Sequence, residues 1–288
     1  MPAPKAAPDP HAGHTMPSAV APADPHAGHQ MPAPAPTGAD LPVGDAPPPP
    51  PPGVAAADAL FGATEMDAAR KVLRREHGGA RLSKTMVDLF EVRPNSGPDA
   101  YAWEGEFRYG GDIDRLVLKS EGEGEFGHGL EEAEVQALYS RAVGPYFDLQ
   151  AGVRQDFQPR PRRTYATVGF EGLAPYWFEV EGALFLSNKG DLLARLEGAY
   201  DLRLTQRLIL EPRAEVNLAA QDVPAVGIGS GLSDAEIGLR LRYEIKREFA
   251  PYIGVNYERK FGDTADFARA VGEDVEDVRL VVGLRAWF

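Results

Sequence analysis

The stretch Leu192-Leu-Ala-Arg-Leu-Glu-Gly-Ala-Tyr-Asp-Leu-Arg-Leu204 alternates between apolar and charged side chains. One set of alternate positions carries Leu192, Ala194, Leu196, Gly198, Tyr200, Leu202 and Leu204, and the other carries Arg195, Glu197, Asp201 and Arg203. A period of two places successive side chains on opposite faces of a β-strand. The stretch therefore predicts a strand with one apolar face and one charged face.

The same alternation extends from about residue 85 to the C-terminal end of the sequence. It recurs at Tyr101, Trp103, Phe107 and Tyr109 against Glu104, Glu106 and Arg108, and again at Ile237, Leu239, Leu241, Tyr243 and Ile245 against Glu236, Arg240, Arg242, Glu244 and Lys246. We count about 12 such strands, an even number as expected for a single-chain bacterial barrel. The predicted fold class is all-β and antiparallel.

Connection lengths separate a membrane barrel from a soluble sandwich or lipocalin-like barrel, since both alternate in the same way. Longer connections are expected at 122–130, 158–163, 220–232 and 262–276, and short ones at 110–112, 144–145, 173–175, 205–206 and 247–250. Residues 187–190 form a short connection at a place where the alternation of loop lengths predicts a long one. Short periplasmic turns that alternate with longer external loops are typical of outer-membrane barrels. An even strand count then places both termini in the periplasm.

Aromatic residues cluster beside the expected short turns, where an interfacial girdle belongs. They are Tyr109, Tyr146, Phe147, Phe170, Tyr176, Trp177, Phe178, Phe249 and Tyr252. The sequence ends Leu280, Val282, Leu284, Ala286 and Phe288 on the apolar face, which resembles the terminal strand of bacterial outer-membrane proteins. These features favour a transmembrane β-barrel in contact with outer-membrane lipids.

The N-terminal residues have a different composition. Seventeen of the 26 prolines lie in residues 1–57, which contain no aromatic residue. Such a segment has too little apolar surface to offset the entropy of ordering, so we predict a disordered periplasmic tail at 1–57. Residues 58–83 are expected to be a linker with a short helix at 64–77, which a capping box at Thr64 and Asp67 would begin and Gly78 would end. The barrel is expected to span 84–288.

Charge and composition narrow the partners. The net charge of −13 argues against nucleic acid and favours cations, and the absence of cysteine excludes thiolate metal sites. No apolar run reaches the roughly 20 residues of a transmembrane helix. Residues 1–30 lack the apolar core of a secretory signal, so either a signal has been removed or the protein is cytosolic.

The tail contains a repeat, Asp9-Pro-His-Ala-Gly-His-Thr-Met-Pro17 followed by Asp24-Pro-His-Ala-Gly-His-Gln-Met-Pro32. Imidazole suits Cu(II) and thioether favours Cu(I), so this combination predicts a copper site in either oxidation state. Gly13 and Gly28 allow the backbone to fold back and bring the two imidazoles of each repeat together. The predicted metal ligands are His11, His14, Met16, His26, His29 and Met31.

A low-complexity linker with incidental histidines is the simpler alternative, but a packing role is unavailable in a segment without a core. Two further histidines are weaker candidates. His77 shares a helix face with Met66 in the expected helix, although a solvated residue is the more common case. His128 lies in the acidic stretch 121–128, which we interpret first as a flexible charged loop.

The polar strand faces would line the lumen. Their charges are mixed in sign and most simply form cross-strand ion pairs that fill a narrow interior, which argues against a wide aqueous pore. Met86 is the one soft ligand expected among them. The charged residues assigned to the lumen are Glu104, Glu106, Asp148, Arg154, Glu179, Glu181, Arg195, Glu197, Glu211, Arg213, Glu215, Arg240, Arg242 and Glu244.

Several stretches closely resemble the bacterial copper resistance protein B family. They are Trp103-Glu-Gly-Glu-Phe-Arg-Tyr-Gly-Gly-Asp-Ile-Asp-Arg-Leu-Val-Leu-Lys-Ser-Glu-Gly-Glu123, Ala137-Leu-Tyr-Ser-Arg-Ala142, Gly172-Leu-Ala-Pro-Tyr-Trp-Phe-Glu-Val180, Leu204-Thr-Gln-Arg-Leu-Ile-Leu210 and Gly229-Ser-Gly-Leu-Ser-Asp234. The resemblance covers about residues 80–288. It implies an outer-membrane protein of copper resistance that works beside a periplasmic multicopper oxidase and sequesters copper or moves it across the outer membrane.

The tail resembles the His/Met-rich N-terminal regions of that family, but its two repeats make bulk storage doubtful. A general or structural porin, with the tail as a tether, remains the alternative function. An enzyme is not expected, because only His77 and His128 lie outside the tail and no Gly-x-Ser-x-Gly elbow occurs.

Overall fold

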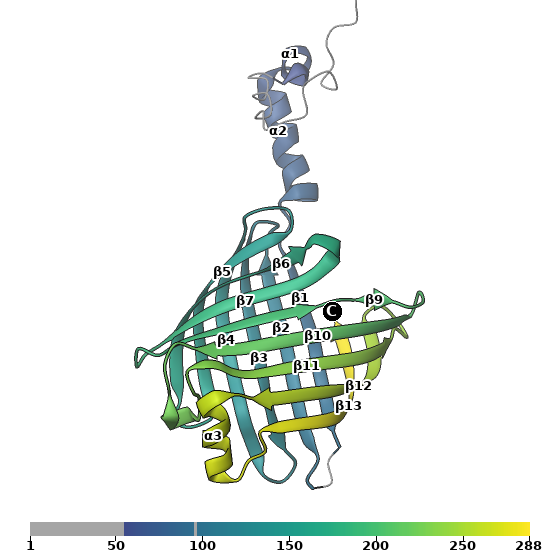
Figure 1. Ribbon diagram of the computed structural model, residues 1–288. Coiled ribbons are helices and arrows are strands. Elements are labelled where there is room, and N and C mark those ends of the chain that lie inside the picture. Colours follow the sequence, from purple (N-terminus) through teal and green to yellow (C-terminus); the bar gives the residue numbers. More distant parts are fainter. Residues whose placement is uncertain (1–54, 95–96) are drawn as a thin grey trace, which may run out of the picture. The chain divides into compact units, whose positions relative to one another are not determined.

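Residues 55–94 and 97–288 are described by the computed structural model (Figure 1). The chain divides after Leu60 into two units, and each is described by itself. None of the helices in the described ranges has both the length and the apolar character that a membrane-crossing helix requires.

The N-terminal helices are α1 (Ala56–Phe61), α2 (Ala63–Leu73) and the π-helical turn η2 (Arg74–Gly78). The predicted helix at 64–77 is therefore confirmed. The predicted capping box is wrong, because Gly62 precedes the helix and no side chain caps it. Asp67 instead accepts a hydrogen bond from Arg70 Nη2 at 2.7 Å, and this guanidinium lowers the pKa of the Asp67 carboxyl.

Residues 82–288 form one closed antiparallel sheet in which strands adjacent in sequence pair with each other, except β8 and β9, and β13 pairs with β1. The strands are β1 (Leu82–Arg93), β2 (Ala100–Gly110), β3 (Asp114–Glu125), β4 (Gly129–Ala142), β5 (Phe147–Gln158), β6 (Arg163–Ala174), β7 (Phe178–Ser187), β8 (Leu192–Ala199), β9 (Leu202–Arg203), β10 (Leu208–Ala219), β11 (Gly231–Tyr243), β12 (Phe249–Lys260) and β13 (Glu276–Trp287).

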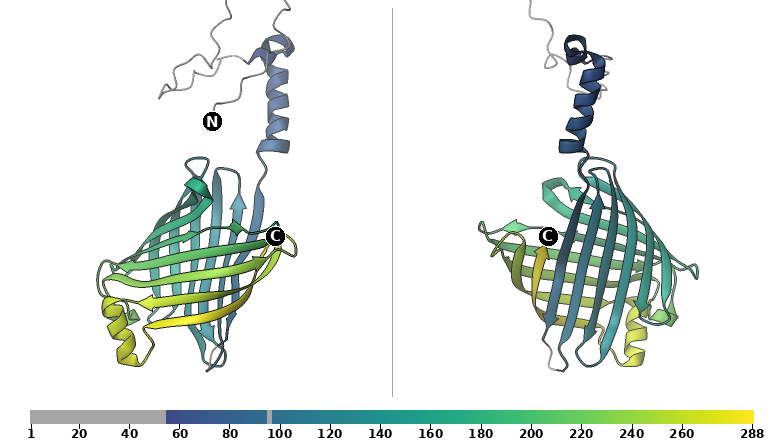
Figure 2. Two further views of the ribbon diagram at one scale, coloured as in Figure 1. Left: turned by 45° about the vertical axis from the view of Figure 1, so that its right-hand side comes forward. Right: turned by 180° about the vertical axis from the view of Figure 1, so that it is seen from behind.

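The two short strands β8 and β9 both pair with β10 and share one position in the wall. The thirteen strands therefore occupy twelve positions, which confirms the predicted barrel. The strands of the near and far walls cross at a steep angle in Figures 1 and 2. This is the tilt that closure of a barrel requires.

One end of the barrel, the short-turn end, carries the connections 111–113, 143–146, 175–177, 204–207 and 244–248. The other, the long-loop end, carries 94–99, 126–128, 159–162, 188–191, 220–230 and 261–275. The long connections expected near 220–232 and 262–276 are confirmed. The long loop expected at 122–130 is wrong, because β3 and β4 extend to a tight turn at 126–128. Glu123 and Glu125 in this stretch continue the period of two and belong to β3.

The two longest loops pack on each other. They contain η4 (Pro224–Val226) and α3 (Gly262–Val271), a helix that the sequence analysis did not predict. The Gly229 amide donates to Thr264 Oγ1 at 2.8 Å, and a Cβ on Gly229 would lie 2.5 Å from the Thr264 nitrogen. This close approach requires glycine at position 229. The Ser230 amide donates to Asp222 Oδ1 at 2.7 Å and lowers the pKa of that carboxyl.

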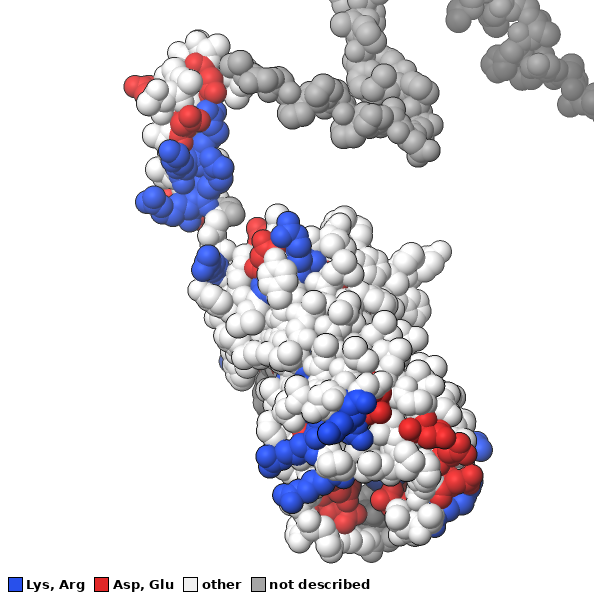
Figure 3. All heavy atoms as spheres, turned by 90° about the vertical axis from the view of Figure 1, so that its left-hand side faces the viewer, with Lys and Arg blue, Asp and Glu red and all other residues white. Residues whose placement is uncertain are grey.

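The outer face of the barrel is apolar. On the face seen in Figure 3, a broad band without charged side chains separates charged groups at the two ends of the barrel. Exposed apolar surface of this extent requires a partner, and a β-sheet satisfies all its backbone groups in lipid only when it closes into a barrel. The barrel is therefore an outer-membrane protein. The exposed residues include Phe90, Leu118, Val135, Val153, Val168, Leu184, Leu196, Ile237, Leu239, Ile253 and Leu280.

Seven of the aromatic residues expected in the girdle, including Tyr146, Tyr176 and Trp177, are exposed beside the short turns. Phe147 is half-buried. Tyr252 is buried and corrects the prediction. It pairs in register with Arg242, whose guanidinium faces the lumen, and only 5% of its surface is exposed. Its ring crosses Gly283 on β13, where a Cβ would lie 2.6 Å from the ring.

Candidate functional site

The six residues predicted to bind copper, His11, His14, Met16, His26, His29 and Met31, lie outside the described residues. Within 55–94 and 97–288, no three His, Asp or Glu side chains are grouped so that they could hold a metal ion. The candidate functional site that the structure describes is therefore the charged lumen of the barrel.

Three further candidates have defined positions. Met66 lies in α2 and His77 in η2, where its side chain is exposed. His128 lies in the turn between β3 and β4, with Nδ1 3.3 Å from Glu125 Oε2. Met86 faces the lumen near the short-turn end, because it pairs in register with Glu106.

Carboxylates form an unbroken row across the lumen wall. Each member is the direct cross-strand neighbour of the next, on successive strands from β5 to β13. The row begins beside a short turn and ends beside the longest loop, because the tilt of the strands carries it from one end of the barrel to the other. Its members are Asp148, Glu171, Glu181, Glu197, Glu215, Glu236, Glu258 and Asp277.

A second, shorter row follows β2 to β5. It consists of Glu104, Glu121, Glu134 and Asp156, again as direct neighbours. Like charges directly opposite on a sheet destabilise it, so both rows need compensation. Lysine and arginine side chains from other strands supply it.

Two bases compensate the short-turn part of the long row. Arg108 on β2 donates through both terminal nitrogens to Glu171 on β6, and it also pairs with Glu106. Lys119 on β3 pairs with Glu181 on β7 and lies 3.8 Å from Glu171. Glu171 is thus shared between two bases.

Two arginines compensate the centre of the lumen. Arg213 lies 2.6 Å from Glu104, 2.8 Å from Glu197 and 4.0 Å from Glu215. Arg195 lies 2.6 Å from Glu121, 3.3 Å from Glu134 and 3.2 Å from Glu215. Each arginine therefore joins the two carboxylate rows.

Near the long-loop end the row has fewer basic neighbours. Neither Glu236 nor Glu258 forms an ion pair with any residue of the described ranges, and Glu132 forms none either. The carboxylates of Glu123, Asp234 and Glu258 repel the carboxylate of Glu132. This part of the lumen therefore carries a net negative field that attracts cations.

The wall formed by β1 and β11–β13 is packed. Leu89, Tyr252 and Val281 form a buried apolar cluster inside the barrel. Beside it, Glu91 is 1% exposed and accepts hydrogen bonds from Arg240 Nε at 2.7 Å and Arg93 Nε at 3.3 Å. The interior here resembles a protein core.

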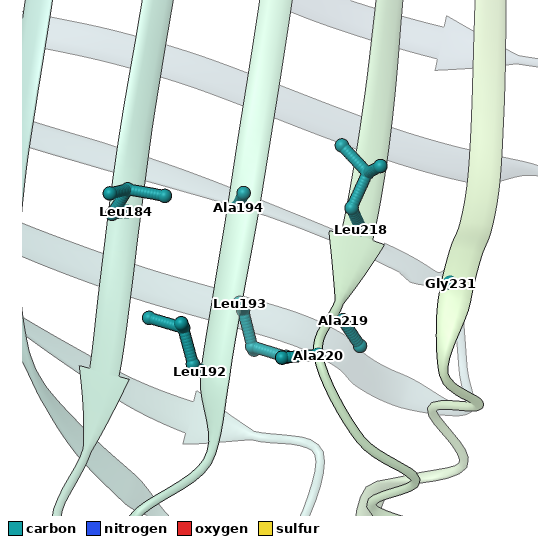
Figure 4. A pocket seen from close by; sticks show the side chains of 8 residues that line it. All are labelled: Leu184, Leu192, Leu193, Ala194, Leu218, Ala219, Ala220 and Gly231. Carbon is teal, nitrogen blue, oxygen red and sulfur yellow. The ribbon is translucent and has the colours of Figure 1, made fainter.

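An apolar cavity of about 230 Å³ lies at the long-loop ends of β7, β8 and β10 (Figure 4). No charged or hydroxyl side chain lines it, so it offers a cation no ligand. Its lining residues are Leu184, Leu192, Leu193, Ala194, Leu218, Ala219, Ala220 and Gly231.

The predicted lumen charges are thus largely confirmed as members of ion pairs. Sequence reasoning missed Glu91, Arg93, Lys119, Glu121 and Glu171, although the first three stand at alternate positions of alternating strands. These residues could have been found by following the period of two along each strand up to the turns at its ends. The register that aligns the carboxylates is absent from any single strand.

A family model described as copper resistance protein B precursor (CopB) matches residues 81–288. The chain belongs to the copper resistance protein B family. This confirms the resemblance noted in the sequence. The match covers the whole barrel described above.

Two curated relatives agree with this assignment. The chain is 49% identical over 212 residues to Copper resistance protein B of Escherichia coli, which covers 74% of this chain and 71% of the relative. It is 46% identical over 228 residues to the Copper resistance protein B homolog of Pseudomonas syringae pv. tomato (strain ATCC BAA-871 / DC3000), which covers 77% of each chain. Among solved structures, the NanC porin is similar at a TM-score of 0.46 and 12% identity, over 71% of this chain and 99% of that chain.

Membership of the family assigns the chain a role in copper resistance. Together with the closed barrel, it identifies a non-enzymatic outer-membrane protein.

Proposed function

We propose that this copper resistance protein binds copper through the His/Met tail at 1–57, in the periplasm, and sequesters it or moves it across the outer membrane. The observation that carries the proposal is the repeated Asp-Pro-His-Ala-Gly-His-x-Met-Pro motif in a chain of a copper resistance family. Imidazole and thioether together suit both oxidation states of copper. The ligands are His11, His14, Met16, His26, His29 and Met31.

The lumen supports the same function by its charge. The long carboxylate row, which extends from the short-turn end to the long-loop end, favours cations over anions. A tail of about 57 residues has a root-mean-square span on the order of 40 Å, enough to reach the mouth of its own barrel and a partner protein. A periplasmic multicopper oxidase is the partner that we propose.

Isothermal titration of the full chain in detergent tests copper binding. We expect saturable binding of Cu(II), and of Cu(I) under reductant, because each repeat offers two imidazoles and one thioether. A full-length chain whose repeats are replaced by Gly/Ser residues is the control. If the heat of copper addition to the parent chain does not reach saturation, the result would instead support a structural barrel with the tail as a tether.

Protease treatment of intact cells tests the orientation. If the tail is periplasmic, the long-loop end faces outward, and surface protease should cut within 220–230 or 261–275 while the 204–207 turn stays intact. Fragment masses from both ends of the chain identify the cut. Cleavage at 204–207 with both long loops intact would invert the proposed orientation.

A further inference from the structure

Four bases, Arg213, Arg195, Arg108 and Lys119, form ion pairs with strands four or five positions away around the wall, and the shortest such pair of each base is considered as one bridge across the lumen. The shorter way around the wall from Arg213 on β10 to Glu104 on β2 passes β11, β12, β13 and β1. The way from Arg195 on β8 to Glu121 on β3 passes β7, β6, β5 and β4. In a wall of twelve positions, these pairs connect almost opposite strands.

Two further pairs join strands that lie slightly closer together around the wall. Arg108 on β2 reaches Glu171 on β6, and Lys119 on β3 reaches Glu181 on β7. Neighbouring pairs on a wall could form around an open channel, but pairs between opposite walls must pass through its centre. These four contacts therefore occupy the lumen itself.

Shared carboxylates link the four bridges in two pairs. Glu215 contacts both Arg195 and Arg213, and Glu171 contacts both Arg108 and Lys119. A network of shared partners holds each side chain in one geometry better than isolated exposed pairs do. Arg195, Arg213 and Lys119 are also more buried than their partners: Arg195 is 19% exposed and Glu121 is 38% exposed. Arg108, which is more exposed than Glu171, is the exception.

Packed side chains complete the obstruction. Among the described residues, the largest fully buried side chains are Phe185, Leu138, Ile209, Glu91, Val117, Val281 and Ser140. Strand alternation turns each of them inward, since its neighbours on the same strand are exposed to lipid. The interior is filled from several strands at once.

We propose that the four cross-lumen ion pairs form a latch that holds the barrel closed to diffusing solutes. Arg195 and Arg213 are its central members, because each binds three carboxylates drawn from both rows. Passage of any ion through the lumen then requires these contacts to break. Copper movement through the lumen would be subject to the same requirement, a consequence that rests on the proposed function.

Conductance of the full chain in planar lipid bilayers, measured in potassium chloride without copper, tests the latch. We expect low conductance for the parent chain and several-fold higher conductance for the double variant Arg195→Met/Arg213→Met. Methionine keeps much of the apolar stem and removes the charge that crosses the lumen. Because no copper is present, failure of the proposed copper function would leave this result unchanged.

The matched control is Arg279→Met. Arg279 pairs with Asp277 two residues away on the same strand, so its loss breaks no bridge and should leave conductance at the parent level. If the double variant lacks heat-modifiable migration, Arg195→Met/Glu121→Gln/Arg213→Met/Glu104→Gln removes both partners of each central pair and should fold and conduct. A folded variant with the parent's conductance, or a parent that already conducts as well as the variants, would overturn the latch.

Discussion

Replacing His11, His14, His26 and His29 with alanine is expected to remove most of the Cu(II) binding of the full chain at neutral pH. The barrel should still fold, because its ion pairs and its apolar belt lie within 82–288. Cu(I) binding should persist in part, since Met16 and Met31 remain and thioether favours the soft ion. Titration calorimetry at matched protein concentration measures both effects.

The pH dependence gives the same prediction a second readout. Cu(II) must displace protons from imidazoles with unperturbed pKa values of about 6.5, so binding by the parent chain should weaken as the pH falls below this value. Thioether binding of Cu(I) should not change over the same range. Replacing Met16 and Met31 with leucine is the matched control. It should reduce Cu(I) binding and leave Cu(II) binding by the histidines in place.

Copper tolerance of cells connects this binding with function. Cells that express the four-histidine variant at the parent level should tolerate less copper than cells with the parent chain. Equal tolerance, at equal amounts of folded protein in the outer membrane, would mean that the tail does not carry the copper resistance function.

Replacing Glu91 with alanine is expected to lower the free energy of unfolding of the barrel by about 3–5 kcal/mol. Glu91 is buried and binds both Arg93 and Arg240. Arg93 keeps Glu123 at 2.8 Å, but Arg240 forms no other ion pair among the described residues. The substitution therefore leaves a buried guanidinium without a counter-charge, and this costs more than the loss of an exposed pair.

Unfolding by guanidinium chloride in lipid vesicles, followed by tryptophan fluorescence, measures this effect. Glu276→Ala is the control, because Glu276 and its partner Arg259 are both exposed and 3.8 Å apart, and its loss should cost about 0–1 kcal/mol. Glu91→Gln keeps a hydrogen-bond acceptor and should fall between the two. Equal stability of Glu91→Ala and Glu276→Ala would show that Glu91 is not a structural brace.

Much of the fold could be predicted because each barrel strand repeats the same local rule. Apolar side chains alternate with charged ones wherever one face meets lipid and the other meets the lumen. The prediction was wrong at 122–130, because the alternation of β3 and β4 continues through residues that were assigned to a loop. It also failed for α3, whose buried Thr264 accepts a hydrogen bond from Gly229 in a loop distant in sequence.

The candidate site was predictable in composition but not in arrangement. The polar faces of single strands already contain Glu104, Glu197 and Arg213. Neither the unbroken carboxylate row nor the pairing of Arg213 with Glu104 can be read from one strand, because each depends on register and on which strands face each other. Tyr252 shows the same limit, since alternation near a turn did not reveal that its ring lies inside the barrel.

Period, composition and repeats are local properties of the chain, so they were enough to predict an antiparallel membrane barrel and its family, and they also predict a copper-binding motif in the tail. Only the tertiary structure decided which charges meet across the lumen. Closure brings β13 beside β1 and faces β8 and β10 toward β3 and β2, so residues such as Arg213 and Glu104, distant in sequence, come within 2.6 Å. Whether a charged lumen is open or closed depends on these distances, and therefore on the closed fold.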